Sequence, residues 1–245
     1  MEKVYSRTAA IGKDMVSGFC PGCMHSTVFK LIGEVLEDLN VVDKTAAVLG
    51  IGCCGLGMSY ITYDNTTAPH GRACAVATGV KRSTPDTIVY TYQGDGDLAS
   101  IGLAETMHAA NRGENITVIF INNGIYGMTG GQMAPTTLIG MKATTAVQGR
   151  IAEQHGYPMH MCEILNQLTA PVYLERCSCN TPANVMKTRK AIKKAFQNQI
   201  DNKGFSMIEI VTNCPTNWGM DALESLKFLE EKMLEEYPLG VLRDK

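Results

Sequence analysis

The sequence lacks an excess of either charge, a long apolar run and any repeated or low-complexity segment. Its 22 Lys and Arg residues oppose 24 Asp and Glu residues, which gives a net charge of −2. No basic surface is therefore predicted for nucleic acid or for an anionic membrane. No stretch approaches the roughly 18 apolar residues that a membrane-spanning helix needs. The N-terminal segment also lacks the basic and then apolar order of a signal peptide, so we expect a cytoplasmic protein.

The composition is that of a globular protein. Of the 245 residues, 45% are hydrophobic and 19% are charged, which is enough apolar material to bury a full core. We predict one domain over residues 1–245, with an N-terminal Cys-x-x-Cys segment and a C-terminal helical extension.

Short apolar runs alternate with segments of helical periodicity. Strands are predicted at 46–51, 87–93, 115–122 and 205–212, and helices at 25–39, 71–83, 98–112 and 182–199. This alternation predicts an α/β fold with a doubly wound parallel sheet. The charged amphipathic segment 220–240 is predicted to be a helix that covers an edge of the sheet or a partner.

Glycine-rich and polar loops follow the predicted strands. Their sequences are GIGCCGLG at 50–57, GDGD at 94–97, NNGIYGMTGGQ at 122–132 and TNCPTN at 212–217. In doubly wound sheets, ligands bind outside the carboxyl ends of the strands, where the strand order switches. We therefore expect the four loops to meet at one rim of the sheet.

The segment from Gly94 to Asn123 has the chemistry to bind a phosphate and a divalent cation. A Gly-Asp-Gly turn before a helix presents backbone amides and the positive end of the helix dipole to an anion, while Asp95 faces the cation. Asn123, at the end of the next predicted strand, offers a second oxygen. Mg²⁺ prefers about six oxygen ligands, which usually include phosphates and waters. The alternative role for Asp95 is that of a helix cap.

Nine cysteines are many for a chain of this length. In a reducing compartment they favour metal ligation or redox chemistry over disulfides. Cys20 and Cys23 form a Cys-x-x-Cys turn, Cys53 and Cys54 lie in a glycine-rich loop, and Cys214 follows the last predicted strand. Buried free thiols are expected for the other four, Cys74, Cys162, Cys177 and Cys179.

The spacing of GDG, 25 residues and NN resembles the diphosphate-anchoring motif of thiamine diphosphate enzymes. The resemblance implies that the side chains of Asp95 and Asn123 and the carbonyl of Ile125 bind Mg²⁺. It also places Gly94, Gly96 and Asp97 beside the diphosphate.

The motifs FCPGCMH, GIGC, HGRACAVATGVK, GDGD, NNGIYGMTGGQ and NCPTN occur in an order similar to that of the β subunits of 2-oxoacid:ferredoxin oxidoreductases. The similarity spans about residues 16–220 and implies the thiamine diphosphate-binding fold of that family. It further implies a 4Fe-4S cluster, which takes four thiolates. The implied cluster ligands are Cys20, Cys23, Cys53 and Cys214. Cys54 is an alternative to Cys53, and a zinc site or buried free thiols are the alternative to a cluster.

The resemblance implies a set of residues that contact the cofactor. They are Ile51, Gly52, Cys53, Cys54, His70, Gly94, Asp95, Gly96, Asp97, Asn123, Ile125, Gly127 and Met128. No catalytic side chain is expected in this chain, because in the family the Glu that activates thiamine lies on a separate α subunit.

The implied activity is the oxidative decarboxylation of a 2-oxoacid to acyl-CoA and carbon dioxide, with electrons passed through the cluster to ferredoxin. The implied partners are the α subunit, γ and δ ferredoxin-like subunits or domains, ferredoxin, the 2-oxoacid and coenzyme A. Two other functions remain open, an iron-free thiamine diphosphate decarboxylase or synthase subunit and a noncatalytic metal-binding assembly subunit.

The loop after Asn123 bears on the choice of 2-oxoacid. The resemblance places Met128 beside the reacting end of the cofactor, and Gly130 occupies a position where relatives that act on 2-oxoglutarate often carry a lysine. An apolar side chain without a nearby cation favours a branched-chain acid such as 2-oxoisovalerate, with pyruvate and 2-oxoglutarate as the other candidates.

Overall fold

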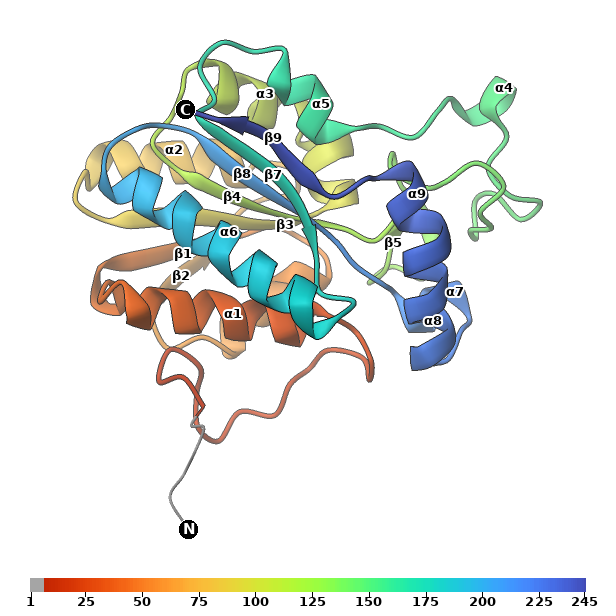
Figure 1. Ribbon diagram of the computed structural model, residues 1–245, viewed down its shortest axis with the longest axis horizontal. Helices are drawn as coiled ribbons and strands as arrows, with labels where there is room; N and C mark the ends of the chain where they lie inside the picture. The colour runs from red at the N-terminus through yellow and green to blue at the C-terminus, as the bar shows by residue number, and fades with distance from the viewer. Residues whose placement is uncertain (1–6) are drawn as a thin grey trace.

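A seven-stranded sheet in the order β2-β1-β3-β4-β8-β7-β9 runs through the molecule (Figure 1). The computed structural model describes residues 7–245, so the first six residues of the predicted domain lie outside the described part. The strands are β1 (Thr45–Leu49), β2 (Asp64–Thr67), β3 (Ile88–Gly94), β4 (Thr117–Asn122), β7 (Tyr173–Ser178), β8 (Ser206–Val211) and β9 (Gly240–Asp244). All neighbours are parallel except β7 and β9. The predicted doubly wound parallel sheet is confirmed, except that the edge strand β9 is antiparallel.

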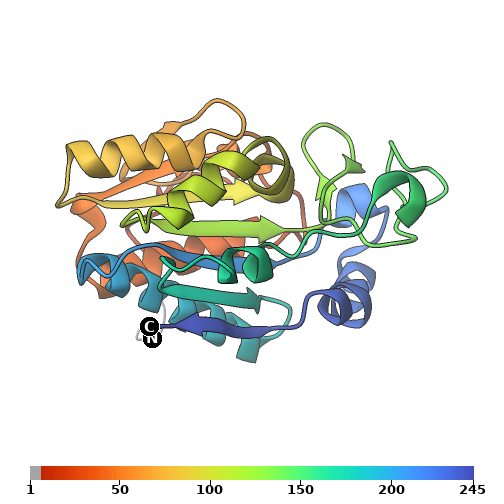
Figure 2. The ribbon, with the colours of Figure 1, turned by 90° about the horizontal axis from the view of Figure 1, so that it is seen from above.

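Alternate residues of the central strands face two helical layers, as the period of two in a strand requires. On one face Tyr90 and Ile119 pack in a core with α1 (His25–Asp38) and α6 (Pro182–Ile200). On the other face, Val89 and Val118 pack with α2 (Ala73–Ser83) and α3 (Leu103–Asn111). Figure 2 shows the helices on both sides of the sheet.

Shorter elements complete the chain. They are α4 (Ala152–His155), α5 (Met161–Asn166), α7 (Pro215–Trp218), α8 (Ala222–Phe228), α9 (Leu234–Glu236), the hairpin strands β5 (Ile125–Tyr126) and β6 (Gln132–Met133), and helical turns at Val42–Lys44, Cys53–Ser59, Gly96–Ile101 and Leu229–Met233. The helices α8 and α9 with the turn between them form the predicted C-terminal helical segment, which lies at the carboxyl end of the strands (Figure 1). No helix within residues 7–245 is long and apolar enough to cross a membrane.

The sequence does not predict β7, because this buried strand carries charged residues. The Arg176 guanidinium is 1% exposed and donates to Glu209 of β8 at 2.9 Å and to Glu163 of α5 at 2.8 Å. Paired in this way, the charges are compatible with burial. The strands β2 and β9 escape prediction for another reason, since they are edge strands with exposed residues and no apolar run.

The topology explains why the glycine-rich loops meet. The chain leaves β1 for the edge strand β2 and then returns to β3 on the other side of β1, so the strand order switches between β1 and β3. The loops after β1, β3, β4 and β8 all begin at the carboxyl ends of these strands. A Cβ atom added to Gly127, after β4, would lie 3.4 Å from Cys53 Sγ, after β1, and 3.6 Å from Cys214 Sγ, after β8.

Candidate functional site

Asp95 lies directly after β3 and is held by donors from three segments of the chain. Its Oδ1 accepts from the backbone N–H of Gly96 at 2.9 Å, and its Oδ2 accepts from the backbone N–H of Ile125 at 3.2 Å and the hydroxyl of Thr136 at 2.7 Å. Oδ1 therefore caps the helical turn after β3, as the helix-cap alternative predicts. Oδ2 instead links this turn to the segment after β4. Thr136 is a site residue that the sequence motifs did not indicate.

The Asp95 carboxylate is buried and has no basic side chain beside it in the described part of the chain. The residue is 2% exposed, and no described basic side chain within residues 7–245 forms an ion pair with it. Burial raises the pKa of Asp95 to about 6, although hydrogen bonds from Thr136 and backbone amides oppose this rise. Because a buried carboxylate is costly unless it is paired or coordinates a metal, this environment fits a divalent cation.

Asn123 and Ile125 meet Asp95 at one point. The side-chain oxygen of Asn123 accepts from the backbone N–H of Ile125 at 3.2 Å, and the same N–H contacts Asp95. The indole N–H of Trp218, in α7, donates to the backbone carbonyl of Asn123 at 3.2 Å. The structure therefore brings together the three residues that the thiamine diphosphate motif implied as Mg²⁺ ligands, and their oxygen donors suit that ion.

Gly96 allows the hairpin to approach the turn after β3. A Cβ atom at this position would lie 2.1 Å from Cε1 of Tyr126, whose hydroxyl donates to the Gly96 carbonyl at 3.2 Å. We expect Gly96→Ala to lower the free energy of unfolding by about 1–3 kcal/mol, because the Tyr126 ring must move.

The matched control is Gly79→Ala, in the interior of α2, where no atom lies within 4 Å of the added Cβ. It is expected to raise the free energy of unfolding by up to about 1 kcal/mol through helix propensity. Urea unfolding of both variants checks the pair. If both substitutions changed the free energy of unfolding equally, the close packing of Tyr126 against Gly96 would not explain the effect at Gly96.

Asp97 ties the loops after β1 and β2 to the site. Its Oδ1 accepts from the backbone N–H groups of Gly71 at 2.8 Å and Ile51 at 3.2 Å, and its Oδ2 accepts from the Gln93 side chain at 2.7 Å. The Nδ1 atom of His70 lies 2.6 Å from Oδ1, off the axis of an aligned hydrogen bond. Asp97 is thus occupied by protein donors, while His70, about one-third exposed, keeps its other ring nitrogen available for a ligand.

The predicted cofactor residues line one cavity of about 110 Å³, which we call the Asp95 cavity. Its lining includes every residue of the predicted set except Gly94, which is the last residue of β3 beneath it. Three further residues line it that the motifs did not assign to the cofactor, His25, Tyr126 and Thr129. Of these, Tyr126 and Thr129 lie within the predicted loop NNGIYGMTGGQ, so only His25 comes from a distant segment.

A second cavity of about 360 Å³ adjoins the first and contains the four predicted cluster cysteines. Cys20, Cys23, Cys53 and Cys214 all line this cysteine cavity, and all four are free thiols. Burial raises the pKa of Cys23 to about 12 and that of Cys53 to about 11, with smaller contributions from the neighbouring thiols. Four thiolates so placed would repel one another unless a positively charged centre lies between them.

The two adjacent cysteines of the loop after β1 have different surroundings. Cys53 lines both cavities, whereas Cys54 lines the Asp95 cavity only and is fully buried, which raises its pKa to about 12. This placement favours Cys53 over Cys54 as a cluster ligand. Within residues 7–245, no group of three His, Cys, Asp or Glu side chains is close enough to hold a single metal ion.

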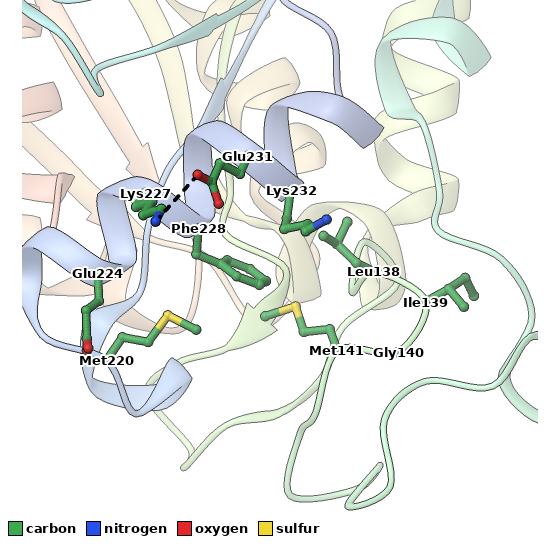
Figure 3. A pocket seen from close by; sticks show the side chains of 10 residues that line it. All are labelled: Leu138, Ile139, Gly140, Met141, Met220, Glu224, Lys227, Phe228, Glu231 and Lys232. Atoms are coloured by element: carbon green, nitrogen blue, oxygen red, sulfur yellow. Dashed lines mark ion pairs between the residues drawn. The ribbon is translucent and has the colours of Figure 1, made fainter.

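A larger cavity of about 640 Å³ lies away from these residues, between the loop at Leu138–Met141 and the helical segment that begins with α8 (Figure 3). Phe228 and Met141 line it, and Lys227 forms an ion pair with Glu231 at 3.8 Å along its wall. It contains none of the predicted cofactor or cluster residues.

Comparison with known proteins gives matches over most of the chain. Residues 50–210 match the family described as "Thiamine pyrophosphate enzyme, C-terminal TPP binding domain". The chain is 47% identical over 227 residues to the ketoisovalerate oxidoreductase subunit VorA of Methanothermobacter thermautotrophicus, which covers 93% of this chain and 48% of that protein. It is 39% identical over 222 residues to the 2-oxoglutarate synthase subunit KorB of Methanocaldococcus jannaschii, which covers 88% of this chain and 78% of that protein.

A solved structure is also similar. It is the 2-oxoglutarate:ferredoxin oxidoreductase from Magnetococcus marinus with 2-oxoglutarate, coenzyme A and succinyl-CoA bound. The TM-score is 0.78 at 25% identity, and the match covers 98% of this chain and 85% of that chain. The present chain spans about half the length of the VorA relatives that it matches.

Proposed function

Since the chain belongs to the thiamine pyrophosphate enzymes with the C-terminal TPP binding domain, and matches β-type subunits of 2-oxoacid:ferredoxin oxidoreductases, we propose that it is the thiamine diphosphate-binding subunit of such an oxidoreductase. The proposed reaction converts a 2-oxoacid and coenzyme A to acyl-CoA, carbon dioxide, a proton and two electrons, and the electrons leave singly to ferredoxin. One observation carries this proposal. The Asp95 cavity, whose carboxylate and amide oxygens suit Mg²⁺, shares Cys53 and Asn123 with a cavity that holds three further thiols.

Each cavity has a distinct role in the proposed reaction. Asp95, Asn123 and the carbonyl of Ile125 would hold Mg²⁺, and His70 would donate to the cofactor diphosphate. When bound there, thiamine diphosphate supplies the electron sink for decarboxylation. Cys20, Cys23, Cys53 and Cys214 would hold a 4Fe-4S cluster, which accepts one electron at a time. The other buried thiols lie outside both cavities apart from Cys54.

The chain would act only with a partner. The Asp95 cavity, at about 110 Å³, is smaller than complete ligand pockets of roughly 300–1,000 Å³. A whole cofactor would therefore extend beyond this chain, toward the α subunit that carries the activating Glu. Exposed apolar side chains at the rim, among them Ile51 and Met128, would be covered by that subunit. The γ and δ ferredoxin-like subunits or domains and ferredoxin complete the proposed assembly, which we place in the cytoplasm.

We propose 2-oxoisovalerate or a similar branched-chain acid as the substrate. Met128 is 49% exposed and lines both cavities, so its thioether can contact an aliphatic chain. Gly130 has a φ of 104° and no atom within 4 Å of an added Cβ. This position therefore contributes neither a positive charge nor a side chain that would limit the length of the substrate. The ketoisovalerate oxidoreductase subunit VorA, at 47% identity, supports the same choice.

The test is ferredoxin reduction by the chain copurified with its partner subunits, measured with 2-oxoisovalerate, pyruvate and 2-oxoglutarate in turn. We expect 2-oxoisovalerate to have the highest kcat/KM. In Met128→Ala, kcat/KM for 2-oxoisovalerate should fall about tenfold or more while that for pyruvate falls less, because the longer chain loses an apolar contact.

Met186→Ala is the control for this substitution. Met186 is 53% exposed on α6 and lines neither cavity, so the preference among acids should not change. Carbon dioxide release without ferredoxin reduction by an iron-free protein would instead indicate a decarboxylase. If Met128→Ala had the same ratio of kcat/KM for 2-oxoisovalerate to kcat/KM for pyruvate as the wild type, the proposed contact between Met128 and the substrate would be overturned.

A further inference from the structure

His25 lies between the two cavities and has no role in the function proposed above. The residue is 3% exposed and lines both the Asp95 cavity and the cysteine cavity. It begins α1, two residues after Cys23. A buried imidazole is therefore adjacent to a predicted cluster ligand.

Tyr92 fixes which nitrogen of His25 carries the hydrogen. Nδ1 of His25 lies 2.8 Å from the hydroxyl of Tyr92, which is fully buried and has no other hydrogen-bond partner among residues 7–245. If Nδ1 donated to this hydroxyl, the hydroxyl hydrogen would be buried without an acceptor, which is costly. Tyr92 is therefore the donor and Nδ1 the acceptor, so the neutral ring carries its hydrogen on Nε2.

The ring of His25 is held in one orientation. Phe19 stacks on it with ring centroids 5.0 Å apart and planes at 15°, and the Tyr92 ring lies 5.7 Å away at 55°. Within the described residues, the contact of Nδ1 with Tyr92 is the hydrogen bond of this ring, and Nε2 has none. Nε2 is not among the fully buried polar atoms without a partner, so it faces a cavity that the ring lines and can donate its hydrogen to a group bound there.

We propose that Nε2–H of His25 donates a hydrogen bond to a sulfur atom of the 4Fe-4S cluster and raises the reduction potential of that cluster. This inference rests on the proposed function, since the sulfur acceptor belongs to a cluster held by the four cysteines. Hydrogen bonds to cluster sulfurs stabilise the reduced form, which carries one more negative charge. Tyr92 is a positioning residue, because it acts only through the tautomer of His25.

The experiment is a redox titration of the anaerobically purified complex, followed by electron paramagnetic resonance of the reduced cluster. In His25→Leu the donor is lost, and we expect the equilibrium constant for cluster reduction to fall about tenfold, which is a shift of 59 mV to lower potential for one electron. His25→Gln retains an N–H donor and is expected to recover part of the shift. The electron–nuclear coupling to an exchangeable proton should disappear in His25→Leu.

Two variants of strand β3 test whether Tyr92 acts by positioning the hydrogen of His25 or only by packing in the core. Tyr92→Phe removes the group that fixes the tautomer, and we expect a shift in the same direction as in His25→Leu. Tyr90→Phe is the matched control, because Tyr90 is also fully buried in β3 but its hydroxyl contacts Tyr63 at 2.6 Å. Its potential should equal that of the wild type.

The outcomes distinguish this inference from the proposed function. A wild-type complex without iron and sulfide would overturn both. A cluster of normal stoichiometry whose potential is unchanged in His25→Leu would overturn the inference alone. If His25→Leu does not retain the cluster, Tyr92→Phe decides, and a wild-type potential in that variant would overturn the hydrogen bond.

Discussion

Asp95→Asn is expected to abolish thiamine diphosphate binding and turnover while making the cofactor-free chain more stable at neutral pH. The substitution keeps the size of the side chain and one of its two accepting oxygens, replaces the other oxygen by an NH2 group, and removes the charge that would bind Mg²⁺. Changing even the outer partners of a metal ligand typically weakens metal binding 10- to 100-fold. We therefore expect the loss of the ligand itself to weaken binding at least 100-fold.

The stability effect follows from the pKa of Asp95. Burial raises it from 3.8 to about 6, so the folded chain binds this proton more tightly than the unfolded chain does. The associated stability is fully present below pH 3.8 and is lost as the pH rises through 6, by about 3 kcal/mol. Asp95→Asn lacks this loss, so above pH 6 the variant should be more stable than the cofactor-free wild type.

Urea unfolding at pH 5.0 and pH 7.5, with chelator or with Mg²⁺ and thiamine diphosphate, measures both effects. The wild type should gain stability from the ligands at pH 7.5, since they compensate the buried charge, and Asp95→Asn should not. An Asp95→Asn protein that is stabilised by Mg²⁺ and thiamine diphosphate as much as the wild type would contradict the assignment of this cation site.

Cys53→Ser is expected to lose most of its iron and its ability to reduce ferredoxin, whereas the neighbouring Cys54→Ser should retain its iron. Cys53 lines the cavity that contains Cys20, Cys23 and Cys214, while Cys54 faces the other cavity. A serine hydroxyl is a poor substitute for a thiolate ligand, because iron–sulfur clusters are held by thiolates.

The two variants share the same loop and the same chemical change, so each controls for the other. Iron and inorganic sulfide are quantified after anaerobic purification of both, together with single-turnover reduction of ferredoxin. Loss of iron in Cys54→Ser with retention in Cys53→Ser would reverse the assignment. Retention of iron in both would contradict the cluster site.

The parts of this chain that were predictable from its sequence are those in which local pattern and tertiary role agree. The strands β1, β3, β4 and β8 are apolar runs that end in polar, glycine-rich loops, and a parallel sheet must place those ends at one edge. That geometry explains why Asp95 and Asn123 could be predicted to meet, although Asn123 lies 28 positions after Asp95. The prediction for Ile125 rests on the resemblance to the thiamine diphosphate motif.

The parts that were not predictable depend on contacts between distant segments. Thr136 donates to Asp95 from an irregular loop, where no periodicity indicates the direction of a side chain. Arg176 breaks the apolar pattern of β7 and is tolerated only because Glu209 and Glu163 surround it. His25 has an ordinary place at the start of an amphipathic helix, and only the structure shows that its ring borders two cavities.

One measurement tests most directly whether the two cavities work as one redox site. The complex of this chain with its partner subunits is purified anaerobically, its iron, sulfide and thiamine diphosphate are quantified, and its visible spectrum is recorded before and after 2-oxoisovalerate and coenzyme A are added. We predict four iron and four sulfide atoms per cluster, bound thiamine diphosphate, and bleaching of the cluster absorption only when substrate is present. Bound thiamine diphosphate with no iron, or a cluster that substrate does not bleach, would contradict the proposed oxidoreductase.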